Sequence, residues 1–510
     1  MGVCEERLSV GQEFDTEGAR VLCETGPGVE YGGGGEVILL PHDCKVNLDS
    51  YKECKAHNDL NERGPPMNSD QPAFIDLFSG CGGLSLGLMK AGWKGLFAIE
   101  QSPDAFKTLR YNLIDENEHN TARPKFVWPE QLDAGPHEIA AFLSTHKEYL
   151  ESIRGSVHLV AGGPPCQGFS FAGRRSGNDP RNELFKHHLE VVDILEPELV
   201  LMENVQGIDI AFGEGKGQKR GAKGGTRKSY AGRIFDQLKG HGYHVQQHVI
   251  KAVDFGVPQY RPRYFTIGIR KDLLPSQTCF DIKEELYRIR TEFLERKGLP
   301  ADKPVTVSDA ISDLTTTGKR LVKCTDEESP SGFSEIVYEG PLTSYQRLAH
   351  EGMNGESPNS LRLVNHHPGT IARFKVIHNT CRKGVQLSAS DKARLGLKKN
   401  ATVPLAPDQP SHTLTTLPDD FLHYSEPRIH TVREHARLQS FPDWFAFKGK
   451  YTTGGNRRTR ECPRYSQVGN AVPPLLAEAL GEVLMKILNT VSHTGCITPT
   501  DRPVPVRGDS

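Results

Sequence analysis

The chain has 510 residues, of which 36% are hydrophobic and 25% charged, a composition typical of a globular protein with two or three domains. No apolar run is long enough to span a membrane, and residues 1–30 lack the basic start and apolar stretch of a secretion signal. The 11 cysteines include no C-x-x-C pair, which favours reduced thiols over a disulfide framework or a zinc knuckle. The net charge of −2 does not exclude a nucleic-acid partner, because phosphate binding requires a basic face, not a basic total.

Residues 1–70 show no clear periodicity, so we expect a partly flexible extension of unknown role, with one short apolar piece at 37–40. From residue 73 onward, apolar runs alternate with helix-like segments. This alternation is typical of an α/β fold with a doubly wound, mostly parallel sheet. The predicted strands are 73–78, 96–99, 157–161, 199–202, 243–249 and 264–269.

A glycine-rich turn follows the first predicted strand, with the sequence Phe78-Ser79-Gly80-Cys81-Gly82-Gly83. Such a turn lets backbone amides and a helix start approach a ligand, although a tight turn without a ligand is an alternative. The spacing is not G-x-G-x-x-G, which disfavours a dinucleotide. Glu100 ends the second predicted strand, where a carboxylate can accept both hydroxyls of a ribose; the alternative is a solvated strand-end charge.

The third predicted strand leads into the heptapeptide Gly162-Gly163-Pro164-Pro165-Cys166-Gln167-Gly168. Its glycines and prolines force a sharp, stiff turn that presents one thiol at the carboxyl end of the strand. Open α/β sheets bind their ligands at that edge, so Cys166 is a candidate nucleophile. The alternative is a cysteine that only packs in the turn.

Two further blocks follow the fourth predicted strand. Glu203-Asn204-Val205 closes that strand, and Gln259-Tyr260-Arg261-Pro262-Arg263 precedes the sixth. Residues 213–229 lie between them and are rich in glycine and basic residues. A flexible solvated loop is the simplest interpretation of 213–229, and a disordered basic arm that grips a nucleic-acid backbone is the sharper hypothesis.

The alternation of strands and helices is lost between Arg270 and about residue 427, where short apolar stretches are punctuated by Pro, Gly, Ser and Thr. Residues 433–442 return to helical spacing, which favours a packing helix. The block Gly469-Asn470-Ala471-Val472-Pro473-Pro474 then opens a helix rich in leucine and alanine.

Taken in this order, the blocks resemble the DNA cytosine-5 methyltransferase family, over about 71–271 and 426–485. The resemblance implies a Rossmann-like class I methyltransferase fold, S-adenosyl-methionine as methyl donor and no metal. It also implies double-stranded DNA as the partner and no membrane. Because the extension carries no chromatin-reading pattern, we expect a monomeric bacterial modification enzyme in the cytoplasm, at the nucleoid, with a cognate restriction endonuclease as a candidate partner.

The resemblance also implies which residues hold the cofactor. Phe78 is expected to stack near the adenine, and Glu100 to accept the ribose hydroxyls. Asp133 is the candidate for reading the adenine amino group, although its surroundings depart from the family pattern. The full expected set is Phe78, Gly80, Gly82, Gly83, Glu100, Asp133, Pro164, Asn470 and Val472.

Three residues are expected to act on the cytosine. A thiolate at Cys166 would attack carbon 6, which turns the ring into an enamine that is reactive at carbon 5. By resemblance, Glu203 contacts ring nitrogen 3 and the exocyclic amine, and Arg263 lies near the cytosine oxygen. Because Arg261 and Arg263 are two residues apart, we expect them on opposite faces of an extended chain, so that only one points into the site, which leaves Arg261 for structure or phosphate. Cys81 is expected to pack.

The expected domains follow from the same resemblance. Residues 71–270 form the catalytic domain, 271–426 a smaller target-recognition domain, 427–492 the part that completes the catalytic domain, and 493–510 a flexible tail. Two alternatives stay open at this point: a transfer-RNA cytosine-5 methyltransferase that uses the same cysteine, and a catalytically silent DNA-binding regulator.

Overall fold

The computed structural model describes residues 71–116, 123–165, 184–209, 229–274, 281–397, 399, 401–454, 457 and 460–494, together with two short strands near the N-terminus. These two strands, β1 (Phe14–Thr16) and β2 (Ala19–Val21), pair antiparallel within a separate unit, Met1–Pro66. The apolar piece predicted at 37–40 and the basic loop predicted at 213–229, apart from Ser229, lie outside the described residues.

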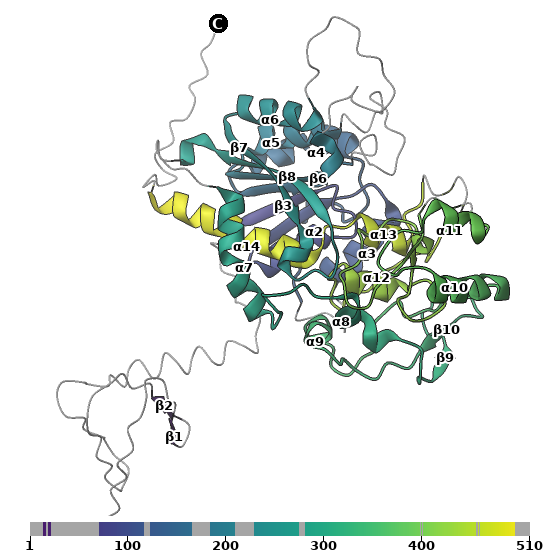
Figure 1. The fold of residues 1–510 in the computed structure, drawn as a ribbon. Coiled ribbons are helices and arrows are strands. Elements are labelled where there is room, and N and C mark those ends of the chain that lie inside the picture. Colours follow the sequence, from purple (N-terminus) through teal and green to yellow (C-terminus); the bar gives the residue numbers. More distant parts are fainter. Residues whose placement is uncertain are drawn as a thin grey trace, which may run out of the picture. The chain divides into compact units, whose positions relative to one another are not determined.

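A six-stranded sheet forms the centre of the second unit, Met67–Ser510 (Figure 1). The strand order is β4-β3-β5-β6-β8-β7, and only β8 runs against the other five. All six apolar runs predicted as strands belong to this sheet, which confirms the predicted mostly parallel α/β fold. The strands are β3 (Ala73–Leu77), β4 (Lys94–Ile99), β5 (Leu159–Gly162), β6 (Leu199–Val205), β7 (Tyr243–Lys251) and β8 (Pro262–Arg270).

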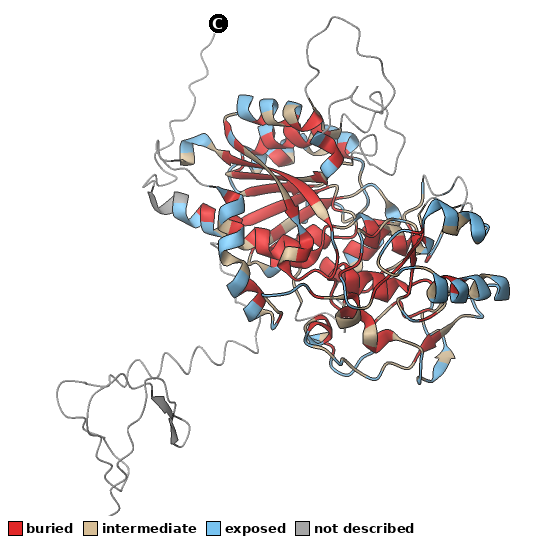
Figure 2. Cartoon of the chain, viewed as in Figure 1, coloured by how far each residue is buried: buried red, intermediate tan, exposed pale blue. Residues whose placement is uncertain are grey.

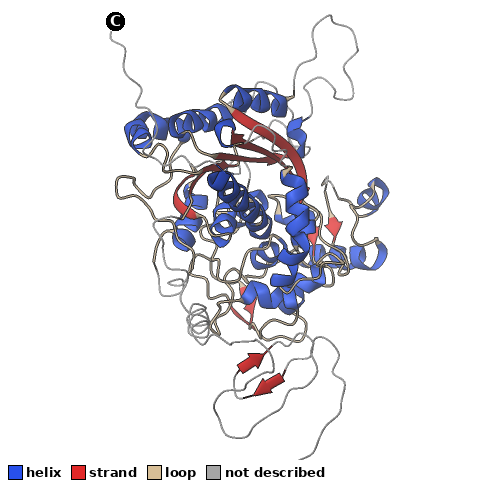
Figure 3. Cartoon of the chain, turned by 90° about the vertical axis from the view of Figure 1, so that its left-hand side faces the viewer, coloured by secondary structure: helices blue, strands red, loops and turns tan. Residues whose placement is uncertain are grey.

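Helices cover both faces of the sheet, as the view in Figure 3 shows. Side chains alternate between the faces along each strand, so Leu199 and Leu201 pack on one side while Val200 and Met202 pack on the other. Because both faces are buried, the strands are almost continuously apolar. The first face carries α2 (Gly83–Lys90), α3 (Pro103–Leu113), α7 (Ile282–Arg296) and α14 (Pro474–Thr494), and the second α4 (Ile139–Ser152), α5 (Leu184–Leu195) and α6 (Tyr230–Gly240).

The last helix among the described residues, α14, packs against α2, the helix that follows the first strand of the sheet. Helix α14 packs along α2, and the indole nitrogen of Trp93 donates a hydrogen bond of 2.9 Å to the Gly481 carbonyl. Gly87 of α2 leaves no room for a side chain, because a Cβ there would lie 2.5 Å from the Pro474 oxygen and 2.7 Å from the Glu478 nitrogen. Residues 83–90 and 474–494 therefore meet in one buried layer.

The region from residue 299 to 422 has mostly short elements and one helix of 13 residues, and lies with α12 (Val432–Leu438) and α13 (Arg464–Asn470) on one side of the sheet (Figure 1). Figure 2 shows a buried centre around α12 and α13 and exposed outer helices. The elements are α8 (Val307–Ile311), β9 (Leu321–Lys323), β10 (Ser334–Ile336), α9 (Ser344–His350), α10 (Pro368–Thr380), α11 (Ala389–Arg394), β11 (Val403–Pro404) and β12 (Phe421–Leu422).

Candidate active site at the carboxyl edge of the sheet

Glu203 of β6 and Arg263 of β8 lie together at the edge of the sheet where the parallel strands end. Arg263 Nε lies 2.9 Å from Glu203 Oε1, and both side chains are almost fully buried. The antiparallel register sets Val205 opposite Arg263, so Glu203 and Arg263 are diagonal neighbours on one face of the sheet. The structure thus brings together two of the three residues predicted to act on a cytosine.

The loop that carries the predicted nucleophile leaves the sheet beside this pair. Gly162, the last residue of β5, pairs with Met202, so Gly163 lies next to Glu203. A Cβ on Gly163 would lie 3.2 Å from Glu203 Oε2, which explains a glycine at this position. Pro164 is buried and Pro165 follows it. Cys166 itself lies outside the described residues, so the structure gives only the direction in which the chain leaves β5.

Burial sets the charge states of the pair. Loss of hydration raises the pKa of Glu203 above its ordinary value, against the opposing effect of the Arg263 and Arg261 charges. Burial likewise lowers the pKa of Arg263, although Glu203 partly offsets the effect. Desolvation therefore outweighs the mutual attraction in both residues. A carboxyl in this setting holds a proton to a higher pH than a solvent-exposed one.

The neighbouring Arg261 is a structural residue in this arrangement. Its Nη2 donates to the carbonyls of Gly469 at 2.8 Å and Ala471 at 2.9 Å, and its Nη1 to Leu414 at 3.3 Å. Strand alternation does not separate it from Arg263, because side chains two residues apart on an extended chain share a face. The difference arises because Arg261 precedes β8 and turns toward the closing segment of the chain.

Sequence reasoning missed the junction that holds the block 259–263 in place. The chain at 411–416 runs beside this block, with Gln259 bridged in parallel to Ser411. Buried Gln259 accepts from the Leu414 nitrogen at 2.8 Å and donates to the Leu438 carbonyl at 3.0 Å. No local sequence pattern predicts these contacts, because the partners are more than 150 residues away in the sequence. The nearest signal was an otherwise unexplained glutamine in a block with two arginines.

The glycine-rich turn after β3 has the backbone geometry of a strained ligand-binding loop. Phe78 has φ 60°, a left-handed conformation that is uncommon for an aromatic residue, and Gly80 and Gly82 follow at 58° and 92°. Ser79 N donates to the Ile99 carbonyl at 3.1 Å, which ties the turn to the end of β4. Phe78 is half-buried against the α4–α6 layer.

Glu100 organises the space in front of this turn. One carboxylate oxygen accepts from Gly80 N at 2.9 Å and the other from Ser102 N at 2.7 Å. Each oxygen keeps a second lone pair that a ribose hydroxyl could use. Burial raises the pKa of Glu100, and the amides of Ser102 and Gly80 oppose that rise. A Cβ on Gly80 would meet no atom within 4 Å, so the turn leaves room beside the acid.

The block 469–474, which lies almost 400 residues further along the chain, contacts the same turn. A Cβ on Gly83 would collide with the Val472 carbonyl oxygen, so the two backbones touch. Val472 is buried and Asn470, the last residue of α13, is exposed. The strained turn, the acid and the closing block therefore converge, and together they fit an adenosyl ligand of the class that the sequence predicts.

Asp133 is the predicted cofactor residue that the structure supports least. Its loop lies beside Glu100, because His137 N donates to the Glu100 carbonyl at 2.9 Å and the His137 ring contacts the Asp133 carbonyl at 3.0 Å. The Asp133 side chain itself is exposed and has no hydrogen-bond partner among the described residues. Cys81, by contrast, is buried, as predicted for a packing residue.

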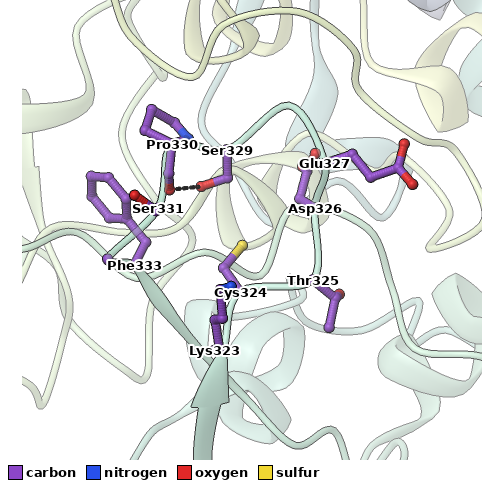
Figure 4. A pocket seen from close by; sticks show the side chains of 10 residues that line it. Lys323, Cys324, Thr325, Asp326, Glu327, Ser329, Pro330, Ser331 and Phe333 are labelled. Carbon is purple, nitrogen blue, oxygen red and sulfur yellow. Dashed lines mark hydrogen bonds between the residues drawn. The ribbon is translucent and has the colours of Figure 1, made fainter.

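A hollow in the β9–β10 hairpin is separate from this edge and contains none of the predicted site residues (Figure 4). Its Asp326 receives hydrogen bonds from Arg464 and from the Tyr451 hydroxyl, so the acid anchors the hairpin. The hollow is lined by Lys323, Cys324, Thr325, Asp326, Glu327, Ser329, Pro330, Ser331, Gly332 and Phe333.

No helix within the described ranges is long and apolar enough to cross a membrane.

Comparisons with known proteins identify the family of this chain. Residues 73–486 match the family model of the C-5 cytosine-specific DNA methylases. The type II methyltransferase M.DdeI of Desulfomicrobium norvegicum is 30% identical over 422 residues, which cover 80% of this chain and 87% of that protein. M1.HphI of Haemophilus parahaemolyticus, also a type II methyltransferase, is 31% identical over 420 residues, with coverage of 81% and 87%.

A solved structure shows the same fold. A crystal structure described as a DNA modification methyltransferase encoded within a prophage (E. coli) has a TM-score of 0.54 and 25% identity, and the match covers 82% of this chain and 100% of that chain. The sheet and its catalytic edge define a methyltransferase of the Rossmann-like class. The chain belongs to the C-5 cytosine-specific DNA methylase family, whose members take the methyl group from S-adenosyl-methionine and act on DNA.

Proposed function

We propose that this chain methylates carbon 5 of a cytosine rotated out of a specific duplex DNA sequence, through a covalent adduct with Cys166. The observation that carries the proposal is the buried Glu203–Arg263 pair, 2.9 Å apart, beside the backbone that leads to Cys166. The thiolate must approach carbon 6 from above or below the plane of the ring, which the neighbouring bases cover in a stacked duplex, so the base must leave the helix.

Cys166 starts the reaction in this proposal. Its thiolate forms a bond to carbon 6, and the displaced electron pair moves through the ring toward nitrogen 3, where Glu203 delivers a proton. Carbon 5 is then an enamine carbon and can take up a methyl group. When carbon 5 takes up the methyl group, the proton on nitrogen 3 returns to Glu203. Water, acting as a base, then accepts the proton from carbon 5, and the electron pair of that bond expels the Cys166 sulfur from carbon 6, which restores the aromatic ring and the free thiolate.

Glu203 and Arg263 have different roles toward the cytosine in this proposal. The raised pKa of Glu203 keeps a proton available for nitrogen 3, and the same carboxyl can accept a hydrogen bond from the exocyclic amine, which thymine lacks. Arg263 remains cationic at neutral pH and would hydrogen-bond the exocyclic oxygen, where negative charge develops. The pair thus both selects cytosine and stabilises the attack.

S-adenosyl-methionine supplies an activated methyl group on a sulfonium when it is bound. Among the residues of this chain, Phe78 would stack near the adenine while Gly80, Gly82 and Gly83 shape the turn, and Glu100 would accept the ribose hydroxyls. Pro164, Asn470 and Val472 would line the methionine end. Asp133 is kept as the candidate for the adenine amino group because its loop adjoins Glu100.

The remaining segments receive their roles from this scheme. Residues 271–426 would recognise the DNA sequence, and 427–492 complete the catalytic domain. The named relatives are type II methyltransferases, which supports a modification enzyme of a restriction–modification system with a partner endonuclease, or a solitary counterpart. We place a monomer of this chain at the nucleoid in the bacterial cytoplasm.

The test is methyl transfer by the purified chain from labelled S-adenosyl-methionine to unmodified host DNA and, in parallel, to transfer RNA. We expect label in duplex DNA only, and bisulfite sequencing should place it at cytosines in one sequence context. Label in transfer RNA alone would reverse the choice of substrate. Normal binding of the methyl donor without transfer to either nucleic acid would favour a silent DNA-binding protein.

A further inference from the structure

One segment of the recognition region is strongly basic, although the whole chain is not. Residues 366–400 contain eight lysines and arginines and a single acidic residue, a formal net charge of +7, whereas the whole chain carries −2. This segment contains α10 and α11. A local excess of positive charge of this size is the electrostatic footprint of a polyanion partner.

Helix α10 is held firmly by one side only. Phe374 and Ile377 are buried in a small cluster with Leu387, Leu422 and Ile429, and the ring of His366 lies edge-on to Phe374 with ring centres 5.1 Å apart. The helix begins at Pro368, which has no amide hydrogen to lose at the first turn, and His367 caps it by accepting from Gly369 N at 3.2 Å. The packed side fixes the orientation of the helix.

The opposite side of α10 is exposed to solvent. Ala372, Val376 and Asn379 follow each other at spacings of four and three residues, so they share one face, and all three are exposed; Val376 is 40% exposed. Arg373 and Lys375 lie on the two borders of this face. Figure 2 shows the outer side of α10 exposed. The result is a narrow, uncharged strip with a cation on each side.

The cations of this surface are not used within the described parts of the chain. Arg373, Lys375 and Arg382 are exposed and have no ion pair or side-chain hydrogen bond with any described residue. Other basic residues of the segment have structural partners: Arg394 pairs with Asp391, and Lys399 with Asp419 and Asp420. Arg373, Lys375 and Arg382 are therefore available to bind a ligand.

A chain of contacts connects this surface to the catalytic edge. The His412 ring contacts the carbonyl of Gly384, in the turn between α10 and α11, at 2.8 Å. Thr413, the next residue, donates to the Tyr260 carbonyl at 2.6 Å, and Tyr260 is 49% exposed. Tyr260 belongs to the block that carries Arg263. The basic surface and the catalytic pair are thus joined through a few residues.

We propose that α10 is a DNA-reading helix that lies in the major groove of the substrate duplex, which rests on the function proposed above. Val376 and Asn379 face the base edges, and Arg373, Lys375 and Arg382 contact phosphates on either side of the groove. An α-helix fits the width of the major groove, and an asparagine can pair with an adenine edge through two hydrogen bonds. Cations that border the inserted face fix the helix on the backbone.

The test of the phosphate contacts is the salt dependence of binding to a labelled pool of mixed-sequence duplexes. The variant R373Q/K375Q/R382Q should reduce the slope of log affinity against log salt by about 0.9 per lost contact, or about 2.7 in all, and weaken binding by tenfold or more. A matched variant, K147Q/K239Q/K303Q, removes three exposed lysines elsewhere and should leave the slope unchanged.

An unchanged slope in the first variant would overturn the proposal, as would a reduced slope with transfer RNA but not with duplexes. Bisulfite sequencing of host DNA gives a second, independent measurement for the base contacts. V376A/N379A should relax the methylated context at one or two positions, and an unaltered context would remove the base-reading role. These results differ from failure of the proposed function itself, in which the unaltered chain would methylate no cytosine.

Discussion

At the scale of single residues, the proposal depends on the protonation of Glu203. Glu203→Gln keeps the shape and the hydrogen bonds of the side chain but cannot deliver a proton. We expect kcat to fall by about 10²- to 10⁴-fold, the usual loss for a general acid, while the affinity for the methyl donor is retained. The matched control, Glu100→Gln, should do the reverse and weaken donor binding more than it lowers kcat, and equal effects of both variants would contradict these assignments.

The raised pKa of Glu203 predicts a particular dependence of rate on pH. The protonated carboxyl is present below its pKa and is lost as the pH rises through it, whereas the thiolate of Cys166 increases with pH. The kcat/KM profile of the unaltered chain should therefore fall on the alkaline side of its maximum. Glu203→Gln should lack that fall, and an identical alkaline limb in the variant would assign it to another group.

Arg261 and Arg263 offer a paired comparison of structure and chemistry. Arg261 bonds three main-chain carbonyls in the interior, so Arg261→Gln should lower the free energy of unfolding by about 3 kcal/mol, the usual cost of unpaired buried groups. Arg263→Gln should mainly lower kcat. Denaturant titration with parallel rate measurements separates the two, and comparable destabilisation by both variants would contradict the division of roles.

At the scale of elements, the close contact of α2 with α14 brings distant parts of the sequence together beside the proposed cofactor site. Gly87→Ala would place a methyl group against the backbone of α14, so we expect about 1–3 kcal/mol of destabilisation and weaker binding of the methyl donor. Gly240→Ala is the control, because nothing lies within 4 Å of its added methyl group. Equal stability of the two variants in denaturant would show that the contact can relax.

The sequence predicts the sheet well because its strands are buried on both faces and are therefore apolar throughout, as in 199–202. It also predicts that Glu203 and Arg263 come together, since one lies near the end of β6 and the other near the start of β8. It does not predict the contact of Gln259 with Leu414 or the helix α10. The first depends on partners far apart in sequence, and the second lies in a region of irregular sequence, where helices are stabilised by tertiary packing and not by a long periodic pattern.

At the scale of the whole molecule, three buried histidines form a cluster in α12 and in the segment that precedes it. The rings of His423, His430 and His435 follow one another with centres 5.6 Å and 5.4 Å apart, and all three are fully buried. Burial lowers the pKa of each to about 3, although the Glu434 charge opposes that shift; Arg428, His378 and Lys383 add further positive charge near His423. The cluster is therefore neutral in the folded protein.

This cluster predicts that the molecule is sensitive to acid. A histidine whose pKa is lower when folded binds a proton more readily in the unfolded chain, so stability falls as the pH drops from about 6.5 toward 3. Each residue contributes up to about 1.4 kcal/mol per pH unit in that window. His430→Phe should remove one such contribution from the slope of unfolding free energy against pH. His244→Gln, at an exposed position, should not change the slope, and an unaltered slope in His430→Phe would refute the account.

The most direct test of the central claim is covalent capture of a duplex that carries 5-fluorocytosine at the methylated position. The fluorine cannot leave as a proton does, so the adduct between the enzyme and the base should persist. We expect mass spectrometry to find one DNA strand joined to the peptide that contains Cys166, and no adduct with Cys166→Ala, which should still bind S-adenosyl-methionine. An adduct on another residue, or methylation by Cys166→Ala at a rate near that of the unaltered chain, would contradict the mechanism.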